Sequence, residues 1–309
     1  MPRVSVIIGT YNRADFLRTA ILSVLNQTFQ DFEIIVVDDA SQDHTYKVIQ
    51  ALPERKITYI KHDVNKGIGA VRNTGLLQAT GKYVAFLDDD DEWLPRKLQV
   101  QVDVLEERPE KVGLAYCGFL TVNRANGEIV SQYLPQKIGE MVNHVLVNNW
   151  IGTTSVPLIR KDCFDRVGLF DERMTFGEDW DMFNRIAREF HFEYIKEALV
   201  KYYIHNGPQL TKNAQGIIAS SNILLSKYGD IRPVRRTIGR YYVSIGAKYC
   251  YNYNDREGKD LIVRGIALAP YEVRHYIYLF LAFAGSRNYR KFRAFKNTLG
   301  QLFMKIGIR

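Results

Sequence analysis

Four consecutive carboxylates, Asp88-Asp89-Asp90-Asp91, are the feature of the 309-residue sequence that most suggests chemistry. Adjacent negative charges repel one another unless a cation compensates them. A divalent metal supplies such a charge, and Mg²⁺ is typically held by one or two carboxylates together with substrate phosphates. For an isolated acidic run, a solvated loop or helix-capping carboxylates before Glu92-Trp93-Leu94 would be the better explanation. The context of this run, described below, reverses that preference.

Two other acidic positions could also do chemistry. Asp38-Asp39 follow a β-branched run, where a carboxylate can accept hydrogen bonds from a ribose hydroxyl or a base imide; capping the next helix is an equally good explanation. Asp179 opens a predicted helix, and neighbouring acids would raise its pKa toward that of a general base. The helix N-terminus opposes that shift, and acids are common in a first helical turn for structural reasons alone.

Alternating strands and helices must position these residues. Short apolar, β-branched runs predict buried strands, and apolar residues at helical spacing predict the segments between them. Ser41 and Asp43 are suitable N-cap types, and Gly81 suits the position after a helix C-terminus. The predicted strands are Val4–Ile8, Phe32–Val37, Ile57–Lys61 and Tyr83–Leu87, and the predicted helices are Asp15–Asn26, Thr45–Leu52 and Gly69–Ala79.

This order predicts an α/β fold with a doubly wound, mostly parallel sheet flanked by helices. Ligands bind beyond the carboxyl ends of the strands in such sheets. The loops at 10–13, 38–39 and 88–91 all follow strand ends, so we expect them to converge on one crevice. Residues 112–215 predict mixed strands and loops with one clear helix at Asp179–Phe190. A basic, aromatic helical region follows, so we expect a catalytic domain at 1–215 and a C-terminal α-helical region at 216–309.

The sequence resembles family 2 glycosyltransferases, which have the GT-A fold. The resemblance covers about residues 3–212, and the order and spacing of its motifs are more specific than any one motif. The matching segments are Val4–Arg13, Gln27–Phe29, Asp31–Asp43, Asn65–Gly67, Ala70–Gly75, Phe86–Asp91, Val167–Glu172 and Glu178–Asp181.

The resemblance implies a nucleotide-sugar donor pocket lined by Thr10, Tyr11, Arg13, Asp38, Asp39, Arg72, Asp88 and Asp89. Tyr11 is expected to stack near the base, and Asp39 to hydrogen-bond it. Asp38 is expected to support the loop or the ribose.

The resemblance further implies a divalent metal, Mn²⁺ or Mg²⁺, at Asp88, Asp90 and His205, with Asp90 in direct contact. A hydrogen-bonded structural histidine is an equally good explanation of His205. Asp179 is implied to be the base that removes the acceptor proton.

The implied reaction is an inverting, metal-dependent transfer of a sugar, with UDP as the first candidate nucleotide, in surface polysaccharide or glycolipid assembly. The Q-x-x-R-W signature of processive members is missing, so a single or limited transfer is expected, onto a saccharide or lipid-linked acceptor. Asn148-Asn149-Trp150 could stack on an acceptor sugar, although Trp150 is as readily a core residue.

Other classes of nucleotide-binding enzyme fit the sequence less well. A sugar-phosphate nucleotidyltransferase would need a Gly-rich phosphate loop after the first strand, which this sequence lacks. A dehydrogenase would need a third glycine at the required spacing beyond Gly67 and Gly69. A non-catalytic sugar-binding or scaffold protein is the remaining alternative.

The charge of the chain is unevenly distributed. Residues 226–309 carry a net charge of +12, whereas residues 1–225 carry −4. A basic amphipathic surface with aromatic anchors, as in Arg287–Lys296, can lie among anionic headgroups, although aromatic core packing beside solvated charges explains the pattern as well. No recognition motif supports nucleic-acid binding. Three scattered cysteines and the N-terminal sequence, which lacks a signal-peptide pattern, predict a cytoplasmic protein. The basic region adds the alternative of a peripheral protein at the inner face of the plasma membrane.

Overall fold

The computed structural model describes residues 1–52, 56–142, 151–205, 213–252 and 255–285. The chain forms two compact units, Met1–Lys212 and Asn213–Arg309. The suggested acceptor contact at Asn148-Asn149-Trp150 and the basic segment Arg287–Lys296 lie outside the described residues.

The first unit is built from strands and helices in alternation. Its elements are β1 (Val4–Thr10), α1 (Ala14–Leu25), β2 (Phe32–Asp38), α2 (Thr45–Gln50), β3 (Ile57–Lys61), α3 (Ile68–Gln78), β4 (Tyr83–Asp88), β5 (Glu92–Trp93), α4 (Lys97–Glu107), β6 (Val112–Asn123), β7 (Ile129–Tyr133), β8 (Pro157–Arg160), α6 (Asp162–Val167), α7 (Glu178–Glu189) and β9 (His191–Ile204). The predicted alternation up to Asp88 is confirmed, and no boundary differs from its prediction by more than two residues.

One mixed sheet runs through the unit in the order β3-β2-β1-β4-β8-β6-β9-β5, with β7 on the edge of β6. The first four strands are parallel, as predicted. Beyond them, β8 runs antiparallel to both β4 and β6, which carries the sheet into its second half. The long strand β9 then pairs with β6 in parallel.

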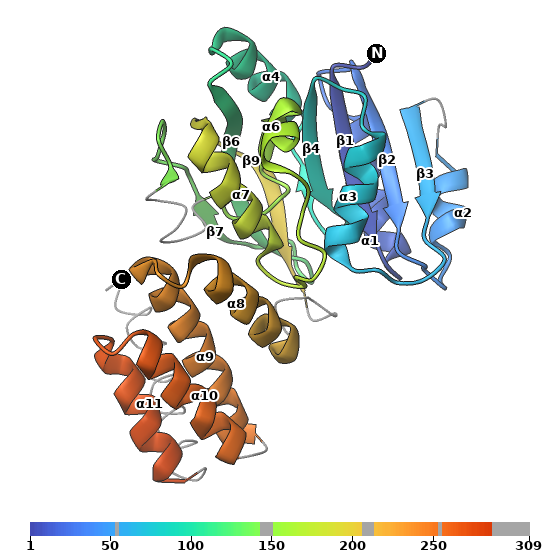
Figure 1. Ribbon diagram of the computed structural model, residues 1–309. Helices are drawn as coiled ribbons and strands as arrows, with labels where there is room; N and C mark the ends of the chain where they lie inside the picture. The colour runs from blue at the N-terminus through green and yellow to red at the C-terminus, as the bar shows by residue number, and fades with distance from the viewer. Residues whose placement is uncertain (53–55, 143–150, 206–212, 253–254, 286–309) are drawn as a thin grey trace. The chain divides into compact units, whose positions relative to one another are not determined.

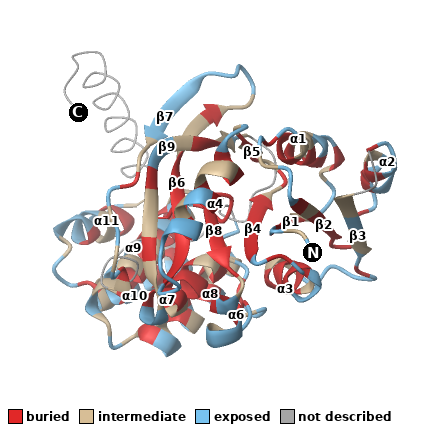
Figure 2. Ribbon diagram, turned by 90° about the horizontal axis from the view of Figure 1, so that it is seen from above, coloured by how far each residue is buried: buried red, intermediate tan, exposed pale blue. Residues whose placement is uncertain are grey.

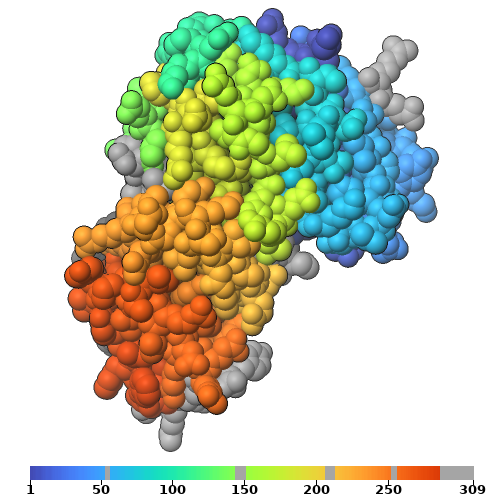
Figure 3. All heavy atoms as spheres, viewed as in Figure 1, coloured from blue at the N-terminus to red at the C-terminus, as the bar shows by residue number. Residues whose placement is uncertain are grey.

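Helices cover the sheet on both sides. In Figure 1, α3, α6 and α7 lie in front of the sheet and α1 lies behind it. Figure 2 shows β4 and β8 buried along almost their whole length, as expected for strands covered on both faces. The space-filling view in Figure 3 shows α3 meeting the segment that leads into α7. At this contact, a Cβ on Gly69 would lie 3.0 Å from Glu172 Cα, so α3 packs closely here.

Three local predictions were wrong. Gly81 does not end α3, because the helix stops at Gln78 with Ala79 as its C-cap; Gly81 instead permits close approach, since a Cβ there would lie 2.7 Å from Ser5 N. Ser41 and Asp43 are not the N-cap of α2, which is His44. The Asp43 carboxylate accepts hydrogen bonds from the backbone N–H of both Thr45 and Ala14, tying this loop to the start of α1.

The second unit is helical, with α8 (Ala214–Tyr228), α9 (Arg232–Asn252), α10 (Asp255–Leu268) and α11 (Val273–Phe283). Val243, Ile262 and Ala282 join α9, α10 and α11 in one core. Two glycine pairs bring α9 and α10 together, Gly239 with Gly265 and Gly246 with Gly258. A Cβ on any of the four would lie within 2.7 Å of the partner's carbonyl oxygen. Among the described residues, no helix combines the length and the apolar character needed to cross a bilayer.

Candidate active site

Three neighbouring strands end at the same level of the sheet. Thr10 pairs with Asp38 across β1 and β2, and Gly9 pairs with Asp88 across β1 and β4. Each of these residues ends its strand or lies one residue before that end, so the loops that follow emerge side by side. This is the edge at which open α/β sheets bind ligands. The predicted convergence of three polar loops is therefore seen in the fold.

The loop after β1 is bound to the acidic run. Thr10 Oγ1 donates to Asp89 Oδ2 at 2.8 Å, and Arg13 Nη1 lies 2.9 Å from both Asp89 Oδ1 and Asp90 Oδ2. Asn12 adopts a left-handed conformation, with φ 53°, which turns the chain so that Arg13 reaches these carboxylates. Burial raises the pKa of Asp89 to about 7, and the positive charge of Arg13 opposes that rise.

Asp90 and His205 meet at one edge of the acidic run. His205 Nε2 lies 3.0 Å from Asp90 Oδ2, although the two residues are far apart in sequence. The imidazole packs on Phe16, with ring centroids 5.1 Å apart, and its side chain is 7% exposed. The predicted metal ligands Asp90 and His205 are thus brought together.

The donor set fits a metal that a ligand helps to hold. Among the residues that the structure describes, no three His, Cys, Asp or Glu side chains are arranged to hold an ion by themselves. The Asp90 carboxylate suits Mn²⁺ or Mg²⁺ when substrate phosphates complete the coordination, and the His205 imidazole lies beside it. Asp88, the third predicted ligand, has other partners: Arg72, Thr153 and Thr154.

A buried guanidinium connects the acidic run to α7. Arg72 Nη2 donates to Asp88 Oδ1 at 3.1 Å and to Thr154 Oγ1 at 2.9 Å. Its other terminal nitrogen is ion-paired with Glu178. The Arg72 side chain is 7% exposed, whereas that of Asp88 is 32% exposed. Arg72 therefore fixes the distance between the end of β4 and the start of α7.

Asp179 lies in the first turn of α7, beside this bridge. Its Oδ1 accepts a hydrogen bond from the N–H of Trp180 at 2.7 Å, and the side chain remains partly exposed. Burial and the charge of Glu178 raise the pKa of Asp179, and the charge of Arg72 opposes both; the resulting pKa is about 7. A carboxylate with a pKa near neutrality can accept a proton at physiological pH.

Asp38 and Asp39 both hold the loops around the expected nucleotide pocket. Asp38 is fully buried and accepts hydrogen bonds from the N–H of Ser41 and the hydroxyl of Tyr59. The Asp39 carboxylate accepts from the N–H of Lys66 and Gly67, both at 2.8 Å. Its Oδ1 also lies 2.8 Å from His62 Nδ1. These contacts agree with the expected support of the loop by Asp38, and a contact of Asp38 with the ribose stays a prediction.

Asp39 retains acceptor capacity, since an ionised carboxylate offers about four lone-pair sites and three are occupied here. Tyr11 is 47% exposed on the loop after β1, where its ring is accessible to a base. The positions of both residues are compatible with the expected nucleotide contacts.

The segment Thr153–Ser155 contacts the acidic run at Asp88 and Asp91, which the sequence did not reveal. Asp91 is buried, accepts a hydrogen bond from Ser155 Oγ at 2.6 Å, and has its pKa raised well above the usual range by burial. It is not a helix cap, because Glu92 and Trp93 form a short strand and α4 begins only at Lys97. Ser155 Oγ also accepts from the N–H of Asp88 at 3.1 Å.

Glu178 was also missed as a site residue. It adjoins Asp179 within the same acidic motif, which was the only available signal. Thr154 and Ser155 carried no signal, since their contacts depend on β8 pairing with β4.

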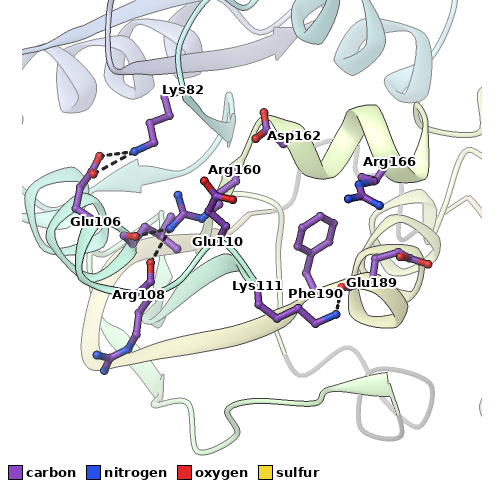
Figure 4. A pocket seen from close by; sticks show the side chains of 11 residues that line it. Lys82, Glu106, Arg108, Glu110, Lys111, Arg160, Asp162, Arg166, Glu189 and Phe190 are labelled. Carbon is purple, nitrogen blue, oxygen red and sulfur yellow. Dashed lines mark hydrogen bonds and ion pairs between the residues drawn. The ribbon is translucent and has the colours of Figure 1, made fainter.

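A separate hollow lies at the opposite end of the sheet. It has a volume of about 490 Å³ and is formed around Lys82, the residue before β4, and Arg160 at the end of β8 (Figure 4). Its charges are largely satisfied within the protein. Lys82 pairs with Glu106, Lys111 donates to a backbone carbonyl, and Arg160 donates to carbonyls at the end of α4. We assign no role in the proposed chemistry to this hollow.

The family model of glycosyl transferase family 2 matches residues 5–168. An uncharacterized glycosyltransferase of Rickettsia prowazekii (strain Madrid E) is 32% identical over 209 residues, which is 66% of this chain and 64% of that protein. The chain thus spans slightly less than two thirds of that relative. The UDP-Glc:alpha-D-GlcNAc-diphosphoundecaprenol beta-1,3-glucosyltransferase WfaP of Escherichia coli is 28% identical over 261 residues, covering 83% of this chain and 99% of that one.

Solved structures show the same fold. Residues 1–349 of S. aureus TarS, in complex with UDP-GlcNAc, align with a TM-score of 0.67 at 18% identity, over 93% of this chain and 89% of that chain. The mannosyltransferase PcManGT from Pyrobaculum calidifontis, in complex with GDP-Man and Mn²⁺, aligns with a TM-score of 0.57 at 18% identity, over 92% and 87%. The predicted fold class, GT-A with C-terminal helices, is confirmed.

Proposed function

The chain belongs to glycosyl transferase family 2, and from this premise we propose that it is an inverting, non-processive glycosyltransferase. It transfers one sugar from a nucleoside diphosphate donor to an acceptor hydroxyl in the assembly of a polysaccharide or glycolipid. UDP is the first candidate nucleotide, supported by the E. coli relative named for UDP-Glc and by the S. aureus structure with UDP-GlcNAc. A lipid-linked saccharide is the first candidate acceptor, because that E. coli relative is named for one.

The observation that carries the proposal is the linkage of Asp88, Arg72 and the start of α7. Arg72 contacts Asp88 at the end of β4 and Glu178 next to Asp179. One guanidinium thereby connects Asp88, which is expected near the donor, to the helical turn that carries Asp179, whose pKa is about 7. This arrangement suits a reaction in which one side of a sugar faces a diphosphate and the other faces a base.

The proposed step is one displacement at the anomeric carbon. The acceptor oxygen forms a bond to that carbon from the face opposite the diphosphate. The bond from the carbon to the diphosphate oxygen breaks, and its electron pair leaves with the nucleoside diphosphate. The acceptor proton passes to the carboxylate of Asp179. General-base catalysis of this kind typically raises the rate by about 10²–10⁴-fold.

The chain's own residues hold and orient the donor. Tyr11 stacks on the base, Asp39 accepts from it, and Arg13 and Arg72 provide positive charge near the diphosphate. Asp90 and His205 would hold Mn²⁺ or Mg²⁺, which supplies charge neutralisation to the leaving diphosphate. The neighbouring structure with GDP-Man and Mn²⁺ supports a metal of this kind.

Transfer and hydrolysis assays with UDP-Glc, UDP-GlcNAc and GDP-Man test the proposal. Asp179→Asn is expected to lower kcat by about 10²–10⁴-fold with little change in the KM of the donor. Asp165→Asn, an exposed carboxylate on α6, makes the same chemical change away from the site and should leave both constants near those of the parent. Near-normal turnover by Asp179→Asn would show that another group is the base.

A non-catalytic sugar-binding protein is distinguished by the same assay. Slow hydrolysis of a nucleotide sugar is expected of a transferase that lacks its acceptor. A chain that binds UDP without hydrolysing or transferring any of the three donors would be a binding protein.

A further inference from the structure

A pocket in the helical unit lies between α9 and α11, outside the site described above. Its volume is about 550 Å³, and its polar lining comes from Arg240, Ser244 and Lys248 on α9 and from Glu272, Arg274 and His275 at the start of α11. The position of the two helices can be followed in Figure 1. Three cations and one carboxylate give this pocket a net positive charge.

Two of the cations have no compensating partner in the described part of the chain. Glu272 accepts from Arg240 at 3.0 Å and is also ion-paired with Arg236, so its negative charge is already shared between two arginines. Lys248 and Arg274 make neither a hydrogen bond nor an ion pair with any described residue. Both residues are exposed at the rim of the pocket, so an anion that enters it can reach their charges.

His275 provides a separate indication of a polar ligand. Its side chain is 4% exposed, and its buried Nδ1 has no hydrogen-bond partner among the described residues. It lies in the first turn of α11, whose N-cap residue, Glu272, makes no side-chain capping bond. Backbone N–H groups at a helix N-terminus favour anions, phosphate among them.

The outer face of α11 is apolar and exposed. Val273, Tyr276, Ile277 and Phe280 recur at helical spacing and are 44–74% exposed; Phe283 continues the stripe at 69%. A soluble helix normally turns such a stripe toward a core. Cations border it, with Lys259 Nζ 5.1 Å from the centroid of Phe283 and Arg232 4.7 Å from that of Tyr271.

We propose that the α9–α11 pocket binds the phosphate headgroup of an anionic lipid, with the outer stripe of α11 lying in the membrane interface. The pocket supplies positive charge and an uncapped helix start, and the stripe supplies apolar and aromatic side chains beside it. An exposed apolar face with a cationic border is typical of helices that lie in an anionic interface. The net charge of +12 over residues 226–309 complements such a surface. The proposal is independent of the glycosyl transfer proposed above.

Co-sedimentation of the full chain with vesicles tests the proposal. Phosphatidylcholine vesicles with and without phosphatidylglycerol are compared, and binding is expected only when the anionic lipid is present. Lys248→Ala/Arg274→Ala should lower the partition coefficient by roughly 30-fold, about the effect of two basic residues near the surface. The matched double variant Arg235→Ala/Arg18→Ala removes two exposed charges elsewhere and should bind far more like the parent.

Phe280→Ser should weaken binding by roughly tenfold through the stripe alone. Lys248→Arg/Arg274→Lys keeps both charges and should restore binding, which distinguishes a lost ligand contact from misfolding. A second measurement tests thermal stabilisation of the chain by inorganic phosphate. Thermal stabilisation by phosphate that Lys248→Ala/Arg274→Ala abolishes, without vesicle binding, would mean a soluble phosphate ligand and overturn the lipid assignment.

Equal binding to both vesicle types, or equal loss in the two double variants, would also overturn it. Because the pocket is outside the proposed active site, donor hydrolysis should be the same in all these variants. Failure of one proposal can therefore be told from failure of the other.

Discussion

Arg13 Nη1 lies 2.9 Å from Asp90 Oδ2, so the carboxylate expected to hold a metal has an arginine as its counter-ion. His205 Nε2 lies 3.0 Å from the same oxygen. The same guanidinium nitrogen also lies 2.9 Å from Asp89 Oδ1. Arg13 therefore offsets the negative charge of two carboxylates of the acidic run.

Asp90→Asn is expected to remove metal activation. The variant keeps the size of the side chain but loses the charge that Arg13 and His205 share, so transfer should fall by about 10²-fold or more at saturating Mn²⁺. The measurement is initial rate against Mn²⁺ and Mg²⁺ concentration. Asp103→Asn on the exposed face of α4 is the matched control. An unchanged activation curve in Asp90→Asn would mean that the metal is held elsewhere.

The acidic limb of the pH–rate profile is expected near pH 7. Burial raises the pKa of Asp179 to about 7, and only the deprotonated form accepts a proton from the acceptor. kcat/KM should therefore rise tenfold per pH unit below this value and level off above it. Asp179→Asn should lose this dependence along with its rate. A limb near pH 4 would show that the carboxylate is solvated during the reaction.

Substitution of Arg72 and substitution of Glu178 should move the acidic limb of the pH–rate profile in opposite directions. The charge of Glu178 raises the pKa of Asp179, and the charge of Arg72 lowers it. Glu178→Gln is therefore expected to shift the acidic limb to lower pH, and Arg72→Gln to higher pH. Profiles of kcat/KM for the two variants measure this. If the substitutions only damaged packing, both variants would be slower, and their acidic limbs would shift in the same direction or not at all.

The first half of the sheet was predictable because its strands are continuous apolar runs. Val4–Ile8 and Tyr83–Leu87 are buried on both faces, so each reads as a strand without knowledge of its neighbours. The acidic residues that follow them are then placed by topology alone. For the same reason the sequence alone predicts that Thr10, Asp38 and Asp88 lie at the same edge of the sheet.

The second half of the site depends on contacts between distant segments. Thr154 reaches Asp88 because β8 pairs antiparallel with β4, aligning Leu158 with Ala85. No periodicity in the segment around Thr154 indicates that pairing. The six-residue helix α6 was also missed, since it is too short to show a helical repeat. The pairing of Arg72 with Glu178 could not be predicted either, because it joins two segments that are 106 residues apart in the sequence.

Gly246→Ala is expected to destabilise the helical unit, although alanine is the better helix former. Propensity alone predicts a gain of about 1 kcal/mol in the free energy of unfolding. A Cβ on Gly246, however, would lie 2.5 Å from the carbonyl oxygen of Gly258, and the two helices must separate to accept it. Overpacking of this kind typically costs about 1–3 kcal/mol, which outweighs the gain.

Urea unfolding followed by far-ultraviolet circular dichroism measures the difference, with Arg235→Ala on the exposed face of α9 as the control. Gly258→Ala should have a similar effect, because a Cβ there would lie 2.7 Å from Gly246 O. The double variant should cost less than the sum of the two, since once α9 and α10 have separated for one methyl group the second fits with less strain. Stabilisation by either single substitution would mean that α9 and α10 do not approach through their glycines.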